Sequence, residues 1–270
     1  MNKAASLTDP LERFKLVMVS SVAFMYPSKI YEKPLNPVLG ETYQAFGADG
    51  AKIYMEQTEH HPPISHMLIE GPNGNYKVTG WSTWAVSAGL NNATLKSDGH
   101  KRVVFADGQT IEYNNPGDYF YNLFMGTMGH QMTGRLDFKD VANNIYGQIT
   151  FGCVKKKTQD YFKGEIYQDG KYAADIDGNY MGYMDIYGKR YFDVRELNRV
   201  WNPMSAKGPL SLPSDSTKRT DSNRLAMGDI ERAQQEKDNI ENLQRHDRKL
   251  REACIARRKA GGPKFANIKF

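Results

Sequence analysis

The stretch Glu56–His66 holds the residues with the clearest potential for chemistry. Two adjacent histidines, His60 and His61, are followed directly by Pro62 and Pro63. The two prolines exclude a helix and hold the backbone extended. A turn just before them would let both imidazole rings converge on one ligand, and converging imidazoles can bind a metal ion, transfer protons or hold a phosphate.

The residues alone leave three alternatives to phosphate binding. A metal site needs further ligands, but no HExxH helix or cysteine partner accompanies the pair, and the histidines elsewhere stand alone. An acid–base hydrolase could use Glu56 or Glu59 with His60, although the sequence has no GxSxG motif and no P-loop. The two histidines could also be structural residues that cap a turn.

Two other segments carry cations that could join such a site. Lys33 opens a loop with two prolines, KPLNPVLGE over residues 33–41, just ahead of the first expected strand. Near the C-terminus, Lys237, Glu241 and Arg245 are spaced at i, i+4 and i+8. A helix would align these three side chains in one stripe, with the glutamate between the two cations. The same spacing is also typical of a solvated helix face with surface ion pairs.

Strands must position most of these residues. From about Thr42 to Val194, β-branched and aromatic residues fill short segments separated by dipeptides typical of hairpin turns. These dipeptides are Asp49-Gly50, Asn73-Gly74, Asp98-Gly99, Asp107-Gly108, Asp169-Gly170 and Asp177-Gly178. The segments recur too closely for helices to intervene, which predicts a large antiparallel meander over residues 42–194. Because so many strands in an open sheet leave costly edges, we expect a barrel or near-barrel able to hold a ligand, with a β-sandwich as the alternative.

Helices are expected on both sides of the meander. Asp9 as N-cap and Pro10 at the first helical position begin a helix over residues 9–26, and its apolar spacing predicts that it packs on the core. Residues 195–223 are rich in Pro, Ser and Asn and predict a loop. Residues 224–260 are dense in Glu, Gln, Lys, Arg and Ala, which predicts a long helical region on the surface of the β body. We expect residues 1–270 to form a single domain.

Composition excludes several classes of protein. The 270 residues are 40% hydrophobic and 25% charged, as in ordinary globular domains, and no apolar run reaches the ~18 residues of a spanning helix. Two cysteines argue against a disulfide scaffold and suit a reducing compartment. The net charge of +5 comes from residues 215–270, which hold 14 Lys and Arg against 9 Asp and Glu. This basic tail attracts polyanions, but attraction alone does not distinguish nucleic acid, anionic lipid and acidic protein.

Three ordered motifs resemble those of the oxysterol-binding-protein-related lipid-transfer family. KPLNPVLGE at 33–41 and EQTEHHPP at 56–63 are similar to its two signature motifs, and the second is close to the family's EQxSHHPP. The segment from Leu212 to Arg245, with LPSDS, Gly228-Asp229 and Glu236-Lys237, resembles a third family motif. Glu59 stands where the family usually has Ser, and its carboxylate beside the histidines could weaken anion binding.

The resemblance implies a mainly β domain with flanking helices. Its core would be an incomplete antiparallel β-barrel around a hydrophobic lipid tunnel, with an N-terminal helix and a long C-terminal helix. It also implies a lipid-transfer protein and not an enzyme, with no cofactor. The shared ligand of the family is phosphatidylinositol 4-phosphate, which many members exchange for sterol or another phospholipid. The residues that match the motifs and would hold the headgroup are Lys33, Leu35, Asn36, His60, His61, Lys237, Glu241 and Arg245.

The resemblance also sets expectations for partners and location. Family members usually carry an amphipathic lid ahead of the helix expected at 9–26, and only about ten residues precede that helix here, so we expect the lid to be missing. A tunnel without a lid would hold lipid weakly, or a second copy of the chain would cover it in a homodimer. A lidless sensor or scaffold for phosphoinositide is therefore the alternative to lipid transfer. We expect a cytoplasmic protein that contacts anionic membranes peripherally and does not bind nucleic acid.

Overall fold

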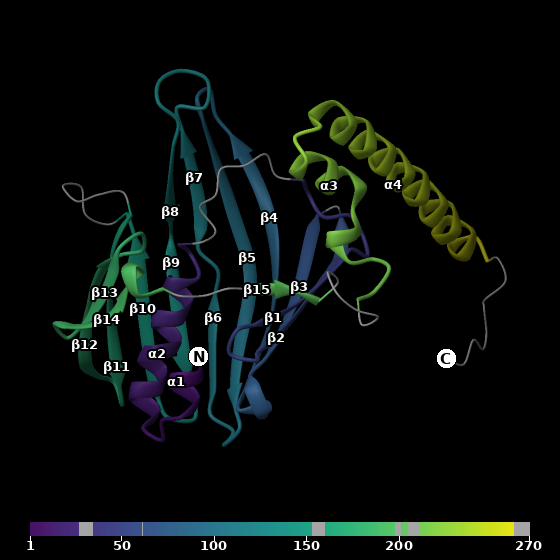
Figure 1. Cartoon of the computed structure of the whole chain (residues 1–270). Helices are drawn as coiled ribbons and strands as arrows, with labels where there is room; N and C mark the ends of the chain where they lie inside the picture. The colour runs from purple at the N-terminus through teal and green to yellow at the C-terminus, as the bar shows by residue number, and fades with distance from the viewer. Residues whose placement is uncertain (27–34, 61, 153–159, 198–200, 205–210, 262–270) are drawn as a thin grey trace.

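The computed structural model describes residues 1–26, 35–60, 62–152, 160–197, 201–204 and 211–261, and fifteen strands among them form one antiparallel sheet (Figure 1). Its strands are β1 (Thr42–Gly47), β2 (Lys52–His60), β3 (Pro63–Glu70), β4 (Tyr76–Ala88), β5 (Asn92–Phe105), β6 (Thr110–Asn114), β7 (Gly117–Tyr121), β8 (Gly129–Thr133), β9 (Arg135–Asp140), β10 (Ile145–Phe151), β11 (Tyr161–Gln168), β12 (Lys171–Asn179), β13 (Tyr183–Ile186), β14 (Lys189–Asp193) and β15 (Trp201–Pro203). The α-helices are α1 (Asn2–Ala5), α2 (Pro10–Ala23), α3 (Thr220–Ala226) and α4 (Ile230–Lys259).

The sheet is a meander in which strands adjacent in sequence are mostly adjacent in space. Its order runs from β14 through β9 to β6 and then through β5 to β1 and β15, while β7 pairs with β5 and β8 beside this path. Within the described residues, β14 and β15 are the two ends of the path and do not pair with each other. The prediction of a large antiparallel sheet that closes incompletely is therefore confirmed.

The predicted turn dipeptides are correct at four positions and wrong at two. Asp98-Gly99 lies inside β5 and Asp177-Gly178 inside β12, whereas the other four dipeptides lie between strands. A Cβ atom on Gly99 would be 2.2 Å from the carbonyl oxygen of Trp81, and one on Gly178 would be 2.4 Å from that of Tyr183. These two glycines therefore allow neighbouring strands to approach closely and do not form turns.

The helix α2 begins where the sequence predicts. Oδ1 of Asp9 accepts hydrogen bonds from the backbone N–H groups of Leu11 and Glu12 at 2.8 and 3.2 Å. On the buried face of the helix, the ring of Phe14 packs 6.3 Å from that of Phe138 on β9. A Cβ atom on Gly147 of β10 would lie only 2.9 Å from side-chain atoms of Phe14 and of Met18, which is also buried. The helix thus packs on the core, as predicted, although it ends at Ala23 and not at residue 26.

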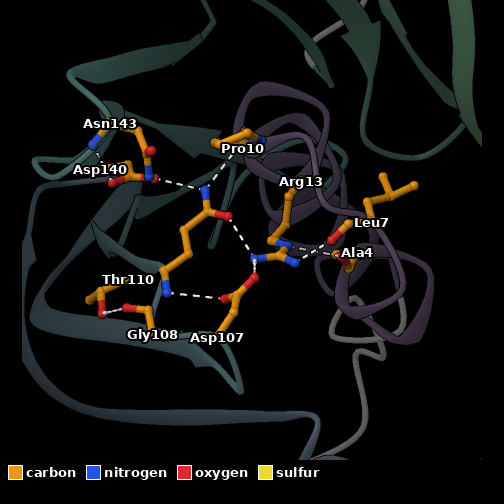
Figure 2. A network of polar contacts seen from close by, with 10 residues as sticks. Ala4, Leu7, Pro10, Arg13, Asp107, Gly108, Thr110, Asp140 and Asn143 are labelled. Carbon is orange, nitrogen blue, oxygen red and sulfur yellow. Dashed lines mark hydrogen bonds and ion pairs between the residues drawn. The ribbon is translucent and has the colours of Figure 1, made fainter.

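A buried polar network fixes the start of α2 on the sheet (Figure 2). Arg13 is 3% exposed and donates to the Asp107 carboxylate at 2.6 Å and to Oε1 of Gln109 at 2.8 Å. Gln109 donates in turn to Oδ2 of Asp140 at 2.7 Å. The guanidinium of Arg13 also donates to two backbone carbonyls of the segment before α2, and its hydrogen bond lowers the pKa of Asp107. The network therefore joins the N-terminal segment to the β5–β6 turn and the end of β9.

The C-terminal helical region begins earlier than predicted. The helix α3 starts at Thr220, inside the segment 195–223 that we expected to be a loop. The helix α4 has Asp229 as its N-cap and buries only Ala233, while its apolar side chains Ile230 and Leu243 are 67% and 66% exposed. Figure 1 shows α4 beside α3 and at the opposite side of the molecule from α2. Among the described residues, no helix combines the length and the apolar character needed to cross a bilayer.

Candidate anion-binding cleft

Three segments that are far apart in the sequence meet at one cleft of about 640 Å³. The predicted site residues Asn36, His60, Lys237, Glu241 and Arg245 all line it. Leu35 is described but is not among the lining residues. Lys33 and His61 lie outside the described residues. The structure therefore brings five of the eight predicted residues together.

The hairpin of β2 and β3 presents His60 to the cleft. In this hairpin His60 is opposite Pro63, and the register shifts between Gln57 and Glu59. The side chain of Gln57 is 3% exposed, donates to the backbone carbonyl of Glu59 at 2.8 Å and accepts a hydrogen bond from the hydroxyl of Ser65. These bonds fix the irregular end of β2, so that Glu59 and His60 both reach the cleft.

Arg219, which the sequence analysis missed, joins the loop around Asn36 to α3. Its guanidinium donates to the carbonyl of Asn36 at 2.7 Å, to Glu41 at 2.8 Å, and to both oxygens of Asp221 at 3.0 and 2.6 Å. The side chain of Arg219 is 10% exposed, and those of Glu41 and Asp221 are 9% and 0% exposed. Glu41 also accepts the backbone N–H of Val38 at 2.8 Å. The basic pair Lys218-Arg219, one residue after LPSDS, was the sequence signal that could have identified this arginine.

The charges around Arg219 stabilise one another in their ionised forms. Burial acts to lower the pKa of Arg219, but its hydrogen bonds with Asp221 and the charge of Glu41 raise that pKa overall. Burial likewise acts to raise the pKa of Asp221, and hydrogen bonds from Arg219 and from the backbone N–H of Ser222 lower it overall. Arg219 therefore holds the loop around Asn36 and Glu41 against the start of α3. Because two carboxylates accompany one guanidinium, this group adds no net positive charge to the cleft.

The helix α4 supplies most of the positive charge of the cleft. The predicted ladder is present, since Glu241 lies 3.5 Å from Nζ of Lys237 and 2.9 Å from Nη2 of Arg245. Arg248 and Arg251, one and two turns further along, also line the cleft. On the β side, Glu59 adds an opposing carboxylate. Several cations on one wall, each with remaining donors, can hold a multiply charged anion.

The described part of the cleft lacks the ligand set of a metal centre. In the parts of the chain that the structure describes, no group of three or more His, Cys, Asp and Glu side chains is placed to hold a metal ion. Of the two pairs considered for acid–base chemistry, Glu59 and His60 line the same cleft, whereas Glu56 is not among the lining residues.

A second cavity, of about 380 Å³, lies between the strands and the end of α2. Its lining is mainly apolar and includes Ile53, Met55, Met67, Ile69, Val78, Val103 and Leu136. Phe24 and Met25, which follow α2, complete the wall on the helix side. The size and apolar character of this cavity suit a hydrophobic ligand.

Sequence comparisons relate the chain to known proteins. A family model described as oxysterol-binding protein matches residues 1–206. Oxysterol-binding protein 9 of Dictyostelium discoideum is 30% identical over 277 residues, which cover 92% of this chain and 64% of that protein. Oxysterol-binding protein-related protein 3 of Mus musculus is 28% identical over 290 residues, which cover 93% of this chain and 32% of that protein. The chain therefore spans less than two thirds of the length of these relatives.

Structural comparisons show the same fold in solved proteins. The Osh1 ORD domain in complex with cholesterol superposes with a TM-score of 0.78 at 20% identity, covering 98% of this chain and 72% of that chain. The Osh3 ORD in complex with PI(4)P from Saccharomyces cerevisiae gives a TM-score of 0.75 at 19% identity, covering 93% of this chain and 73% of that chain. At these identities the similarity concerns the fold, and it confirms the predicted mainly β architecture.

Proposed function

The chain belongs to the oxysterol-binding protein family, and from this premise we propose that it binds phosphatidylinositol 4-phosphate with the headgroup in the anion-binding cleft. The observation that carries the proposal is the meeting of Asn36, His60 and the Lys237–Arg245 stripe at one cleft. The fold is that of a lipid-binding domain, and solved proteins of this fold hold sterol or PI(4)P. The apolar part of the lipid would lie within the sheet, where the second cavity supplies a hydrophobic lining.

The headgroup explains why the cleft needs residues from separate segments. A phosphomonoester carries about 1.5 to 2 negative charges near pH 7 and three acceptor oxygens. Lys237 and Arg245 would pair with these oxygens, while Glu241 keeps the two cations in register. A single hydrogen bond to a charged group contributes ~1.5–3 kcal/mol, so a few such bonds suffice for a selective site. Lys33, Leu35 and His61 complete the proposed headgroup site.

We infer that the protein exchanges this lipid for sterol or another phospholipid between membranes, as a peripheral cytoplasmic protein without catalytic activity. A sensor that holds phosphoinositide without releasing it is the alternative, and it uses the same cleft. Lipid transfer between two populations of liposomes separates them. Transfer predicts that the phosphoinositide moves from donor to acceptor liposomes, whereas a sensor would bind it and leave it on the donor.

Extraction of lipid from liposomes tests the proposed ligand. Liposomes with phosphatidylinositol 4-phosphate or phosphatidylinositol are incubated with the whole chain, and mass spectrometry identifies the lipid that leaves with the protein. We expect the phosphorylated lipid to be extracted unchanged, and we expect the variant with both His60→Ala and His61→Ala to lose this extraction. Lys249→Ala is the matched control, because Lys249 is an exposed cation of α4 that does not line the cleft.

Three results would contradict the proposal. Equal extraction of the two lipids would show that the protein does not recognise the headgroup. Unchanged extraction by the double histidine variant would show that His60 and His61 do not belong to the site. Release of phosphatidylinositol and free phosphate would instead support the hydrolase that Glu59 and His60 could form.

A further inference from the structure

A single charged side chain, that of Lys101, is found among the described residues that line the apolar cavity. Lys101 lies on β5, two residues before Val103, which is 1% exposed and lines the same cavity. Residues two apart on a strand point to the same face of the sheet. The alternation of β5 therefore places a lysine at a position where the fold otherwise has apolar side chains.

Neighbouring residues hold the ammonium group of Lys101 in place. Its Nζ donates to Oδ1 of Asn115 at 2.5 Å and lies 5.5 Å from the centre of the Tyr113 ring. Asn115 is 9% exposed, and its Nδ2 donates to the carbonyl of Trp81 at 3.5 Å and to the hydroxyl of Ser82 at 3.2 Å. These two bonds fix the amide with its oxygen toward the lysine.

Among the described residues, no carboxylate pairs with the ammonium group of Lys101, and its one hydrogen bond is to Asn115. Burial lowers the pKa of Lys101 to about 8, so the side chain is still mostly protonated at pH 7. An ammonium group has three donors, and one protein acceptor leaves capacity for a ligand. A wholly apolar ligand would cover this charge without pairing it, which is costly in an apolar cavity.

We propose that Lys101 pairs with an acidic end group of the ligand that fills the cavity, so that the site prefers a long-chain carboxylate to a neutral lipid of equal length. One cation matches one carboxylate, whereas a phosphate would need several. The ion pair would be a charge-assisted hydrogen bond in surroundings of low polarity, where it is strongest. The proposal rests on the proposed lipid-binding function and concerns the second lipid, for which it favours a long-chain acid over neutral sterol. The apolar chains of a phosphoinositide would occupy the same cavity without pairing Lys101.

Two fluorescent probes of equal length test this preference. The whole chain is titrated at pH 7 with cis-parinaric acid and with its methyl ester, which differ in the charge of one end. We expect the acid to bind at least tenfold more tightly than the ester. In Lys101→Met, which keeps the length of the side chain and removes its charge, this preference should disappear. Lys96→Met is the matched control, because Lys96 is an exposed lysine of β5 outside the cavity.

The possible results separate this proposal from the wider function. Equal affinity of the wild-type protein for acid and ester overturns the role of Lys101, and it does so even where a variant fails to fold. Failure of both probes to bind overturns the lipid cavity together with this proposal, while headgroup binding is judged separately by lipid extraction. His60→Ala should leave the ratio of acid to ester affinity unchanged. A changed ratio would mean that the acid binds in the cleft, which also overturns the proposal.

An independent observation concerns the tip formed by the β4–β5 and β7–β8 loops. Figure 1 shows these strand ends projecting together beyond the rest of the sheet. Four large apolar side chains at the tip are exposed: Leu90 by 99%, Phe124 by 80%, Met125 by 75% and Met128 by 50%. Residues 84–95 and 119–129, which build the tip and its stems, contain no charged side chain.

Hydrogen bonds from side chains within the tip satisfy four of its backbone groups. Oδ1 of Asn91 accepts the backbone N–H groups of Phe124 and Met125 at 2.8 and 3.0 Å, and its Nδ2 donates to the carbonyl of Met125 at 2.9 Å. Nδ2 of Asn122 donates to the carbonyl of Thr127 at 3.0 Å. Polar backbone groups with partners inside the protein cost less to move into an apolar medium than unpaired ones.

We infer that this tip inserts into the surface of a lipid bilayer. The stems carry Trp84 and the stacked rings of Tyr119 and Tyr121, and such amphipathic rings favour the boundary between water and lipid. Pairing of the tip with a second copy of the chain is the less suitable alternative, because the four exposed apolar side chains of the tip present on the order of 600 Å². That area is below the ~800 Å² that each partner buries in a standard interface.

Flotation of the whole chain with vesicles of pure phosphatidylcholine tests the insertion. Vesicles without net charge remove the contribution of the basic C-terminal region. We expect binding that resists high salt and that falls at least tenfold in the variant with Leu90→Asp and Phe124→Asp. Val141→Asp is the matched control, because Val141 is 69% exposed in the β9–β10 turn, away from the tip. Unchanged binding of the double variant overturns the inference, and so does self-association of the wild-type chain that the double variant abolishes.

Discussion

Replacing Arg219 with methionine should destabilise the segments that form the β side of the cleft. The guanidinium lies 2.8 Å from Glu41 and 2.6 Å from Asp221, whose side chains are 9% and 0% exposed. Methionine fills a similar volume but leaves both buried carboxylates without their cation. Removal of one partner from a buried ion pair costs ~3–5 kcal/mol. We therefore expect Arg219→Met to lower the free energy of unfolding at pH 7 by about that amount.

The loss should depend on pH with a defined sign. Hydrogen bonds from Arg219 hold the pKa of Asp221 below its ordinary value, although burial acts in the opposite direction. A carboxyl group whose pKa is lowered by folding stabilises the protein above its unfolded pKa of ~3.9, and this stabilisation is lost as the pH falls through the folded value. The variant lacks the arginine that causes the shift. The difference in stability between wild type and variant should therefore be full at pH 7 and shrink as the pH falls below about 4.

Urea unfolding followed by circular dichroism at pH 7 and pH 3 measures this difference. Arg232→Met is the matched control, because Arg232 is 65% exposed and lies 3.6 Å from Asp229, so its removal should cost ~1 kcal/mol or less. A loss in Arg219→Met no larger than in Arg232→Met would refute the role of the buried pairs. An equal loss at both pH values would refute the assignment of the effect to carboxylate charge.

Three further changes have defined outcomes. Lys237→Ala should weaken binding to liposomes with phosphatidylinositol 4-phosphate by ~1.5–3 kcal/mol at fixed salt, whereas Lys249→Ala should not. Equal effects of the two substitutions would mean that α4 is only a general basic surface. Gln109→Leu should lower the free energy of unfolding in urea by ~1–3 kcal/mol, because it breaks the network of Figure 2 and leaves buried polar groups unsatisfied. An unchanged free energy of unfolding would show that this network does not stabilise the fold. Gly178→Ala should lower the melting temperature, since its Cβ would lie 2.4 Å from a carbonyl oxygen of β13, while at Gly182 the nearest atom is 3.8 Å away and alanine should be tolerated.

The sequence predicted the fold well where the deciding interactions are local. Asp9 and Pro10 specify the start of α2 within a few residues, and the structure confirms that cap. Gly99 and Gly178 were mistaken for turn residues because each follows an aspartate, which is the local signal of a hairpin. Their role depends on how closely the neighbouring strand approaches, and that distance is a property of the sheet and not of the dipeptide.

The same distinction applies to the candidate site. His60 and the stripe at 237–245 are short motifs, and the structure brings them to one cleft, while Leu35 is not among its lining residues. Arg219 and Lys101 gave no motif of this kind. The role of Arg219 depends on two buried carboxylates, one of them far away in the sequence, and that of Lys101 depends on the apolar residues of other strands that surround it. Such roles become visible once the sheet brings these residues together.

The two walls of the cleft differ in how firmly they are held. The β side is fixed by Arg219 and by the hydrogen bonds of Gln57, whereas α4 buries only Ala233 among its residues and meets α3 through a 3.3 Å hydrogen bond from Thr220 to Glu236. An anion that contacts both walls would therefore stabilise the position of α4 as well as fill the cleft, because a ligand stabilises the arrangement to which it binds. Substitutions on the β wall would remove one contact with the headgroup. Substitutions on α4 would remove a contact and also part of what keeps the helix against the cleft, so the proposed site would couple ligand affinity to the position of the helix.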